Sequence, residues 1–135
     1  MATTTATITL NSTDLLSDEL ALSTTATLTS AGTSTGLTTA EGLSRKKTTS
    51  NSQYTLFSAS NFTDDKAHKV YLKNTETTAG LYFLVSIHDV EVGRLYAGDW
   101  ALIPWSADTT GDNADFKITP SSTASHTLEY MLFTD

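Results

Sequence analysis

The sequence contains no cysteine, and this absence excludes disulfides, zinc sites built on thiolates and a cysteine nucleophile. No run of residues approaches the roughly 20 apolar positions that a membrane-spanning helix needs. The opening decapeptide MATTTATITL also lacks the basic start and the continuous apolar stretch of a secretory signal. We therefore expect a soluble product that is made in the cytoplasm and has no membrane partner.

Basic residues are scarce, because eight Lys and Arg stand against 15 Asp and Glu, for a net charge of −7. A protein that binds nucleic acid neutralises phosphates with Lys and Arg, so we expect no nucleic-acid partner. The sole basic cluster is Arg45, Lys46 and Lys47. It could touch an acidic partner surface, although short charge runs are usually solvated turns, and this second interpretation is favoured.

Aromatic residues are absent from residues 1–53, since all of them lie between Tyr54 and Phe133. Ser and Thr fill 23 of the first 50 positions. This segment therefore buries little large apolar area to offset the entropy lost when a backbone is ordered. The chain has the length of one domain. We predict an N-terminal arm with edge strands over residues 1–53 and the core of the domain over residues 54–135.

Alternating apolar residues predict strands on both sides of this boundary. In the arm, Ile8 and Leu10 alternate with threonines, Leu20 to Leu28 repeats the pattern, residues 12–18 suit one short helical turn, and residues 31–42 suit a loop. In the core, GLYFLVSI is apolar on both faces, which indicates a central strand covered on both sides. The break at residues 88–91 indicates a hairpin.

Short strands separated by turn signals about every 8–12 residues indicate an all-β fold. We predict an antiparallel β-sandwich or jelly-roll-like domain with an extended, Thr-rich N-terminal arm. A strand with a thin apolar stripe completes a sheet edge on its own subunit or on a neighbour, and we favour the neighbour. The residues expected at a partner or oligomer interface are Ile8, Leu10, Leu22, Leu28, Arg45, Lys46, Lys47, Tyr96, Trp100 and Trp105.

Motifs for catalysis or cofactor binding are missing. The phosphate-binding loop, the dinucleotide fingerprint and the hydrolase motif G-x-S-x-G do not occur, and the three histidines are expected on the surface or in loops. Residues 108–115 collect acids around Gly111, but their spacing does not match a calcium-binding loop. We therefore expect no catalytic residues, no cofactor and no metal, and we do not expect an enzyme.

Tyr96, Trp100 and Trp105 leave two interpretations open. They could form a platform on which a sugar or a partner side chain stacks. Alternatively they cap the core or a subunit interface at the point where Pro104 interrupts strand pairing. The second interpretation is favoured.

Three phrases of the sequence carry a family likeness: AHKVYLKNTETTAG at residues 67–80, VGRLYAGDWALIPW at residues 92–105 and LEYMLF at residues 128–133. With the Thr-rich opening and GLTTAEGLSRK at residues 36–46, they cover much of the chain. In these phrases the chain resembles small virion structural proteins of tailed bacteriophages, especially those of marine and cyanobacterial phages.

The resemblance implies a β-sandwich present in many copies on the capsid surface of a virion assembled in the host cytoplasm. The expected role is that of a decoration or cement protein that binds and stabilises the lattice of the major capsid protein. Its expected partners are that protein and copies of itself, as a dimer or trimer. Two alternatives stay open: a tail or baseplate adaptor, and a glycan-binding host-recognition module that uses Tyr96, Trp100 and Trp105.

Overall fold

The computed structural model describes residues 4–14, 20–29, 37, 39–110 and 113–134 of the chain. Within these ranges the elements are almost entirely strands, and the one helical element is the single 3-10 turn η1 (Ala59–Asn61). The strands are β1 (Thr5–Ser12), β2 (Leu20–Thr27), β3 (Thr39–Ala40), β4 (Ser44–Thr48), β5 (Tyr54–Phe57), β6 (His68–Asn74), β7 (Tyr82–Ile87), β8 (Val90–Tyr96), β9 (Trp100–Trp105), β10 (Phe116–Pro120) and β11 (His126–Thr134). None of the described residues belongs to a helix with the length and apolar character of a membrane span.

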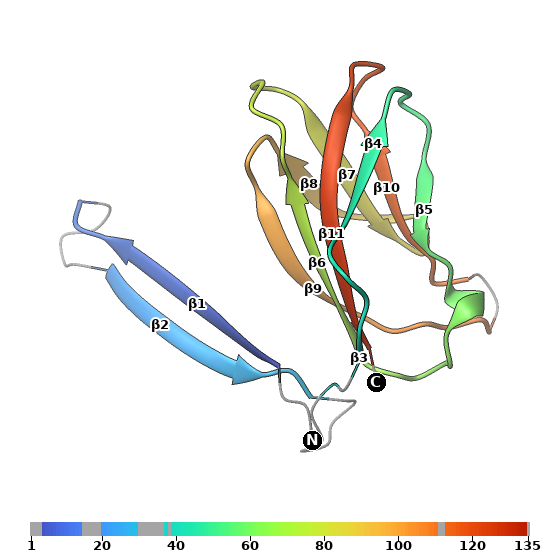
Figure 1. Ribbon diagram of the computed structural model, residues 1–135, viewed down its shortest axis with the longest axis horizontal. Helices are drawn as coiled ribbons and strands as arrows, with labels where there is room; N and C mark the ends of the chain where they lie inside the picture. The colour runs from blue at the N-terminus through green and yellow to red at the C-terminus, as the bar shows by residue number, and fades with distance from the viewer. Residues whose placement is uncertain (1–3, 15–19, 30–36, 38, 111–112, 135) are drawn as a thin grey trace.

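Two antiparallel sheets pack face to face and form a β-sandwich (Figure 1). The four-stranded sheet has the order β5-β10-β7-β8. The five-stranded sheet has the order β3-β11-β6-β9, and β4 pairs with β11 on the same side as β3. The prediction of an all-β, antiparallel sandwich is thus confirmed, whereas the jelly-roll order and the extended arm stay predictions.

The core lies between the sheets, where every second side chain of each strand points inward. Buried Val70 and Leu72 on β6 alternate with residues that face outward, and β10 repeats the pattern with Phe116 and Ile118. One end of the core is aromatic, and there Trp105 is 3% exposed and donates its indole N–H to the Ala114 carbonyl at 2.8 Å. The buried hydrophobic residues of the core are Phe57, Ala59, Val70, Leu72, Phe83, Val85, Leu95, Trp105, Ala107, Phe116, Ile118, Leu128 and Leu132.

Strand β7 lies between β10 and β8, as expected for a central strand. It joins β8 through a two-residue turn at His88 and Asp89, whose φ angles of 55° and 57° are those of a type I′ turn, so the predicted hairpin is confirmed. The outer face of β7 is only half-covered. Its Tyr82 ring lies under the guanidinium of Arg94 and beside the ring of Tyr96, both from β8 of the same sheet. A second layer was expected over this face, but only these side chains of the neighbouring strand β8 cover it, and they do so in part.

Two histidines correct the expectation that all three lie on the surface or in loops. His68 on β6 is 2% exposed and His126 on β11 is 0% exposed, because both occupy inward-facing positions of their strands. The His126 ring stays satisfied inside the protein, since its Nδ1 lies 2.6 Å from the Ala124 carbonyl and its Nε2 lies 3.2 Å from the Ser121 hydroxyl. His88 is exposed, as expected.

Strands β1 and β2 form a separate antiparallel hairpin that extends away from one end of the sandwich (Figure 1). Their register runs from the pair Thr5 and Thr27 to the pair Ser12 and Leu20. The predicted turn over residues 12–18 and the predicted loop over residues 31–42 fall mostly outside the described residues. Further along, residues 39–48 supply β3 and β4 to the five-stranded sheet.

Candidate interaction surface

The acidic loop after β9 is organised by its own hydrogen bonds. Asp108 accepts bonds from the hydroxyl and the backbone N–H of Thr110, at 2.6 and 2.8 Å, and these bonds lower the pKa of the Asp108 carboxyl. Asp115 turns instead to η1, where its Oδ1 accepts the N–H of Ala59 at 2.8 Å. Asp112 lies outside the described residues. Among the residues that are described, no group of three or more His, Asp or Glu side chains could hold a metal ion.

The three aromatic residues that were considered as one platform occupy three different places. Trp105 belongs to the core and is closed to any partner. Tyr96 lies on β8 in the four-stranded sheet, and Trp100 lies on β9 in the five-stranded sheet. The turn between β8 and β9 crosses from one sheet to the other, so a platform of all three residues does not exist. Trp100 is 55% exposed and lies beside the apolar side chains of the five-stranded sheet, whereas Tyr96 is 45% exposed and lies beside Tyr82 of the four-stranded sheet.

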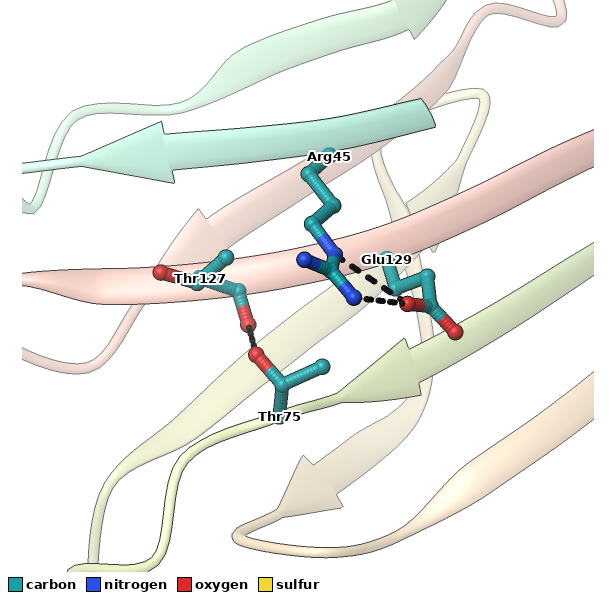
Figure 2. Close-up of polar contacts among 4 residues, drawn as sticks. All are labelled: Arg45, Thr75, Thr127 and Glu129. Carbon is teal, nitrogen blue, oxygen red and sulfur yellow. Dashed lines mark hydrogen bonds and ion pairs between the residues drawn. The ribbon is translucent and has the colours of Figure 1, made fainter. Parts of the chain in front are cut away.

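The outer face of the five-stranded sheet carries a charged row across three strands, and Trp100 continues this row on a fourth. The register places Arg45 of β4 opposite Glu129 of β11, Glu129 opposite Lys73 of β6, and Lys73 opposite Trp100 of β9. Nε and Nη2 of Arg45 both donate to Oε2 of Glu129, at 3.2 and 3.1 Å (Figure 2). Burial, together with the negative charge of Glu129, raises the pKa of the adjacent Tyr71.

Cations are concentrated on this face although the chain is acidic. On β4, Thr48 points inward and Lys46 makes a cation–π contact with the Tyr54 ring, at 5.0 Å. The alternate residues Arg45 and Lys47 therefore point outward. Half of the eight Lys and Arg of the chain therefore share the outer face of the five-stranded sheet: Arg45, Lys47, Lys69 and Lys73. We call these four residues the basic face.

A groove of about 400 Å³ adjoins the basic face, where the base of the β1–β2 hairpin approaches the five-stranded sheet. The sheet contributes Tyr71, Trp100 and Met131, and the hairpin contributes Ala6 and Leu28. These lining side chains are largely apolar. The groove is therefore a hydrophobic recess open to solvent, a type of surface that marks contact sites on soluble proteins.

The hairpin has two faces of opposite character. One face carries the apolar stripe, which we define as Ala6, Ile8, Leu10, Leu20, Leu22, Ala26 and Leu28. The other face carries Thr and Ser pairs, and the hydroxyls of Thr7 and Thr25 lie 2.8 Å apart. At the base, Leu28 is 7% exposed and lines the groove, while Ile8, Leu10 and Leu22 further out are 40%, 50% and 47% exposed. Thr5 and Thr7 of the hydroxyl face also line the groove, so the groove meets the hairpin at its base and not along the apolar stripe alone.

The structure brings some of the residues expected at an interface together and separates others. Leu28, Arg45, Lys47 and Trp100 gather around the groove and the basic face, whereas Lys46 packs on Tyr54 at the other side of β4. The outward residues of β6, which are Lys69, Tyr71 and Lys73, were not among the residues predicted at an interface. Their signal is the alternation in HKVYLKN, where polar or aromatic residues separate Val70 and Leu72.

Comparisons with protein-family models, with curated proteins and with solved structures found no match to this chain.

Proposed function

We propose that this protein is a structural component of a tailed-phage virion, a capsid decoration protein that binds and stabilises the lattice of the major capsid protein. The observation that carries the proposal is the basic face beside the exposed Trp100 on an otherwise acidic chain. The three segments that resemble small virion proteins add to it, because they supply strands β6, β9 and β11 of this same sheet.

The charge distribution suits docking on a repetitive surface. With a net charge of −7 and half of its cations on one face, the molecule is electrically polar, so an acidic lattice would orient it during approach. A partly exposed tryptophan at the edge of the charged row supplies the apolar anchor that interfaces commonly use. Orientation by charge and anchoring by an aromatic ring together favour binding through the five-stranded sheet.

A tail or baseplate adaptor is the alternative that the same surface supports, since a sandwich fold does not fix the partner. The alternative of host-glycan recognition has less support, because the aromatic platform on which it rested is not formed. Electron cryo-microscopy of intact particles distinguishes the first two roles. Density for this sandwich on the capsid shell is expected, and density on the tail would transfer the proposal to the adaptor.

Charge reversal on the basic face is expected to weaken particle binding strongly. In the variant Lys47→Glu/Lys73→Glu both substituted residues are exposed, so the attraction to an acidic lattice is lost while the sandwich loses little stability, by the repulsion of about 1 kcal/mol or less between the new carboxylate at position 73 and Glu129 opposite it. We expect at least a roughly tenfold weaker co-sedimentation with undecorated particles at physiological salt, where exposed charges interact over about 8 Å.

The matched control is Lys66→Glu/Arg94→Glu, which changes the net charge equally. Lys66 lies before β6 outside the sheets, and Arg94 lies on the outer face of the four-stranded sheet. This control should bind particles as well as the wild type does. Equal loss of binding in both variants would mean that only the net charge matters and that the five-stranded sheet is not the docking face.

A further inference from the structure

The groove is built on three rows of residues that cross the outer face of the five-stranded sheet. The rows are centred on β6, whose outward residues are Lys69, Tyr71 and Lys73. Each of these residues pairs with one residue of β11 on one side and with one residue of β9 on the other. All residues that β6, β9 and β11 contribute to the groove belong to these rows. The rows are Phe133, Lys69 and Pro104; Met131, Tyr71 and Leu102; and Glu129, Lys73 and Trp100.

The middle row is apolar, and a lysine of β6 lies on each side of it. Lys69 and Lys73 are four residues apart, so their Cα atoms are separated by about 13 Å at roughly 3.3 Å per residue. Tyr71 between them lines the groove. Glu129 also lines it, but the guanidinium of Arg45 lies 3.1 Å from this carboxylate and offsets its charge (Figure 2). The groove thus has an apolar centre with a cation at either end.

This pattern specifies the chemistry of the occupant. Alternate side chains of an extended peptide point to the same side, and the first and fifth residues are also about 13 Å apart. A segment that reads acidic, apolar and acidic at alternate positions therefore matches the order basic, aromatic and basic along β6. A nucleic-acid strand fits less well, because it carries a phosphate on every nucleotide and would place phosphates over the apolar row. The net charge of −7 would also repel a long polyanion.

We propose that the groove binds an extended acidic segment of the capsid lattice protein, with an apolar side chain on Tyr71 and one carboxylate on each of Lys69 and Lys73. The inference rests on the proposed docking through the basic face and names the part of the partner that docks. Lys69 is available for this role, because its ammonium makes only a long bond of 3.4 Å to the carbonyl of His68. A carboxylate would give it a shorter, charge-assisted bond. Leu28 at the base of the hairpin contributes a wall of the groove.

A synthetic peptide tests this match in the absence of particles. The probe is Asp-Thr-Leu-Thr-Asp with both ends blocked, titrated into isotope-labelled full-length protein and followed by nuclear magnetic resonance. The backbone amide signals of Tyr71, Leu102 and Met131 are expected to shift and to saturate. Signals of the four-stranded sheet should stay in place. Shifts that are spread evenly over both sheets would overturn the inference.

The matched control peptide is Asp-Leu-Thr-Thr-Asp, which has the same composition and charge. Its two acids keep their spacing, but its leucine points to the opposite side and cannot enter the groove together with them. Its dissociation constant is expected to be about tenfold higher, because the leucine stays in water. Equal affinity of the two peptides would mean that charge alone attracts them, and the assignment of the groove would be wrong.

Two single substitutions separate the groove from the rest of the basic face. Lys69→Gln removes a cation from one of the three rows, whereas Lys47→Gln removes one opposite Thr127, outside these rows. Lys69→Gln is expected to raise the dissociation constant of the probe about threefold to fivefold, the usual scale for one exposed ion pair. Lys47→Gln should leave it unchanged. Equal effects would contradict a specific contact with Lys69.

The remaining outcomes distinguish this inference from the proposed function. A short oligothymidylate that binds the groove more tightly than the probe would overturn the assignment to a protein segment. Co-sedimentation with undecorated particles without any peptide binding would overturn the groove inference and leave the docking proposal standing. Peptide binding in the expected pattern without co-sedimentation would exclude the lattice protein as the source of the segment and would overturn the proposed function.

Discussion

Replacing Phe116 by alanine is expected to lower the free energy of unfolding by about 3–5 kcal/mol, the usual cost of truncating a buried aromatic ring. Phe116 is 0% exposed, and its ring centroid lies 6.1 Å from that of Phe57 and 6.3 Å from that of Trp105. The cavity would open between the two sheets, where aromatic rings from several strands meet. Urea denaturation followed by tryptophan fluorescence measures the loss.

The matched control is Val92→Ala on the exposed part of β8, where the side chain is 52% exposed. A substitution of this kind normally changes stability by no more than about 0.5 kcal/mol. A loss below about 1 kcal/mol for Phe116→Ala would show that the aromatic end of the sandwich collapses around the missing ring, as the poorly packed sites of other cores do. Such a result would contradict the tight packing described above.

Asn74→Asp is expected to destabilise the protein by about 3–5 kcal/mol at pH 7, because the variant buries a charge that has no cationic partner and keeps only the hydrogen bond from the backbone N–H of Glu76, at 3.1 Å. Asn74 is 0% exposed at the end of β6. Its amide Nδ2 donates to the carbonyls of Leu81 and Leu95, at 3.2 and 3.0 Å, and so connects the five-stranded sheet to the four-stranded sheet. A carboxylate of nearly the same shape donates nothing to these carbonyls and repels them.

The defect of Asn74→Asp should shrink in acid. Burial and the two carbonyls raise the pKa of the new carboxyl in the folded state above its value in the unfolded chain. The folded variant therefore binds the extra proton first, and its stability relative to the wild type increases as the pH falls through the raised pKa. Urea denaturation of both proteins at pH 7 and at pH 4 measures the difference.

Asn74→Leu is the control for this pH dependence. It removes the same two donors but adds no ionisable group, so its loss of stability relative to the wild type should be the same at both pH values. If the defect of Asn74→Asp is equally independent of pH, the pKa of the new carboxyl is the same in the folded protein and in the unfolded chain, and the account of Asn74 as a buried donor between the sheets is wrong.

Alternation along single strands made part of the fold predictable from the sequence. The apolar positions of GLYFLVSI were enough to identify β7 as a central strand, because neighbouring residues of a strand face opposite sides. The same rule separates Trp100 from Trp105. The two residues lie five positions apart on β9, so one faces the core and the other faces solvent. Applied to β9, the rule would have excluded the shared platform.

Contacts between distant segments could not be predicted in this way. Arg45 and Lys73 flank Glu129 only because β4 and β6 pair with opposite sides of β11 in one particular register. A sequence shows which residues alternate on a strand, but it does not show which strand lies beside it or how far the two are shifted. The basic face therefore became visible only in the structure, and the same is true of the groove at the base of the hairpin.

The hydroxyl face of the β1–β2 hairpin limits how the hairpin can associate with other strands. Thr7 and Thr25 bond to each other across the strands, and Thr9 with Ser23 continues the row at 3.4 Å. A further strand pair would gain little by stacking on these well-hydrated rows, because the hydroxyls bond to each other and to water and offer little apolar area. Contacts that leave a sticky face exposed on both sides propagate into fibres. A threonine-rich strand pair with a single apolar face is thus suited to a protein that exposes apolar residues and yet does not stack without limit.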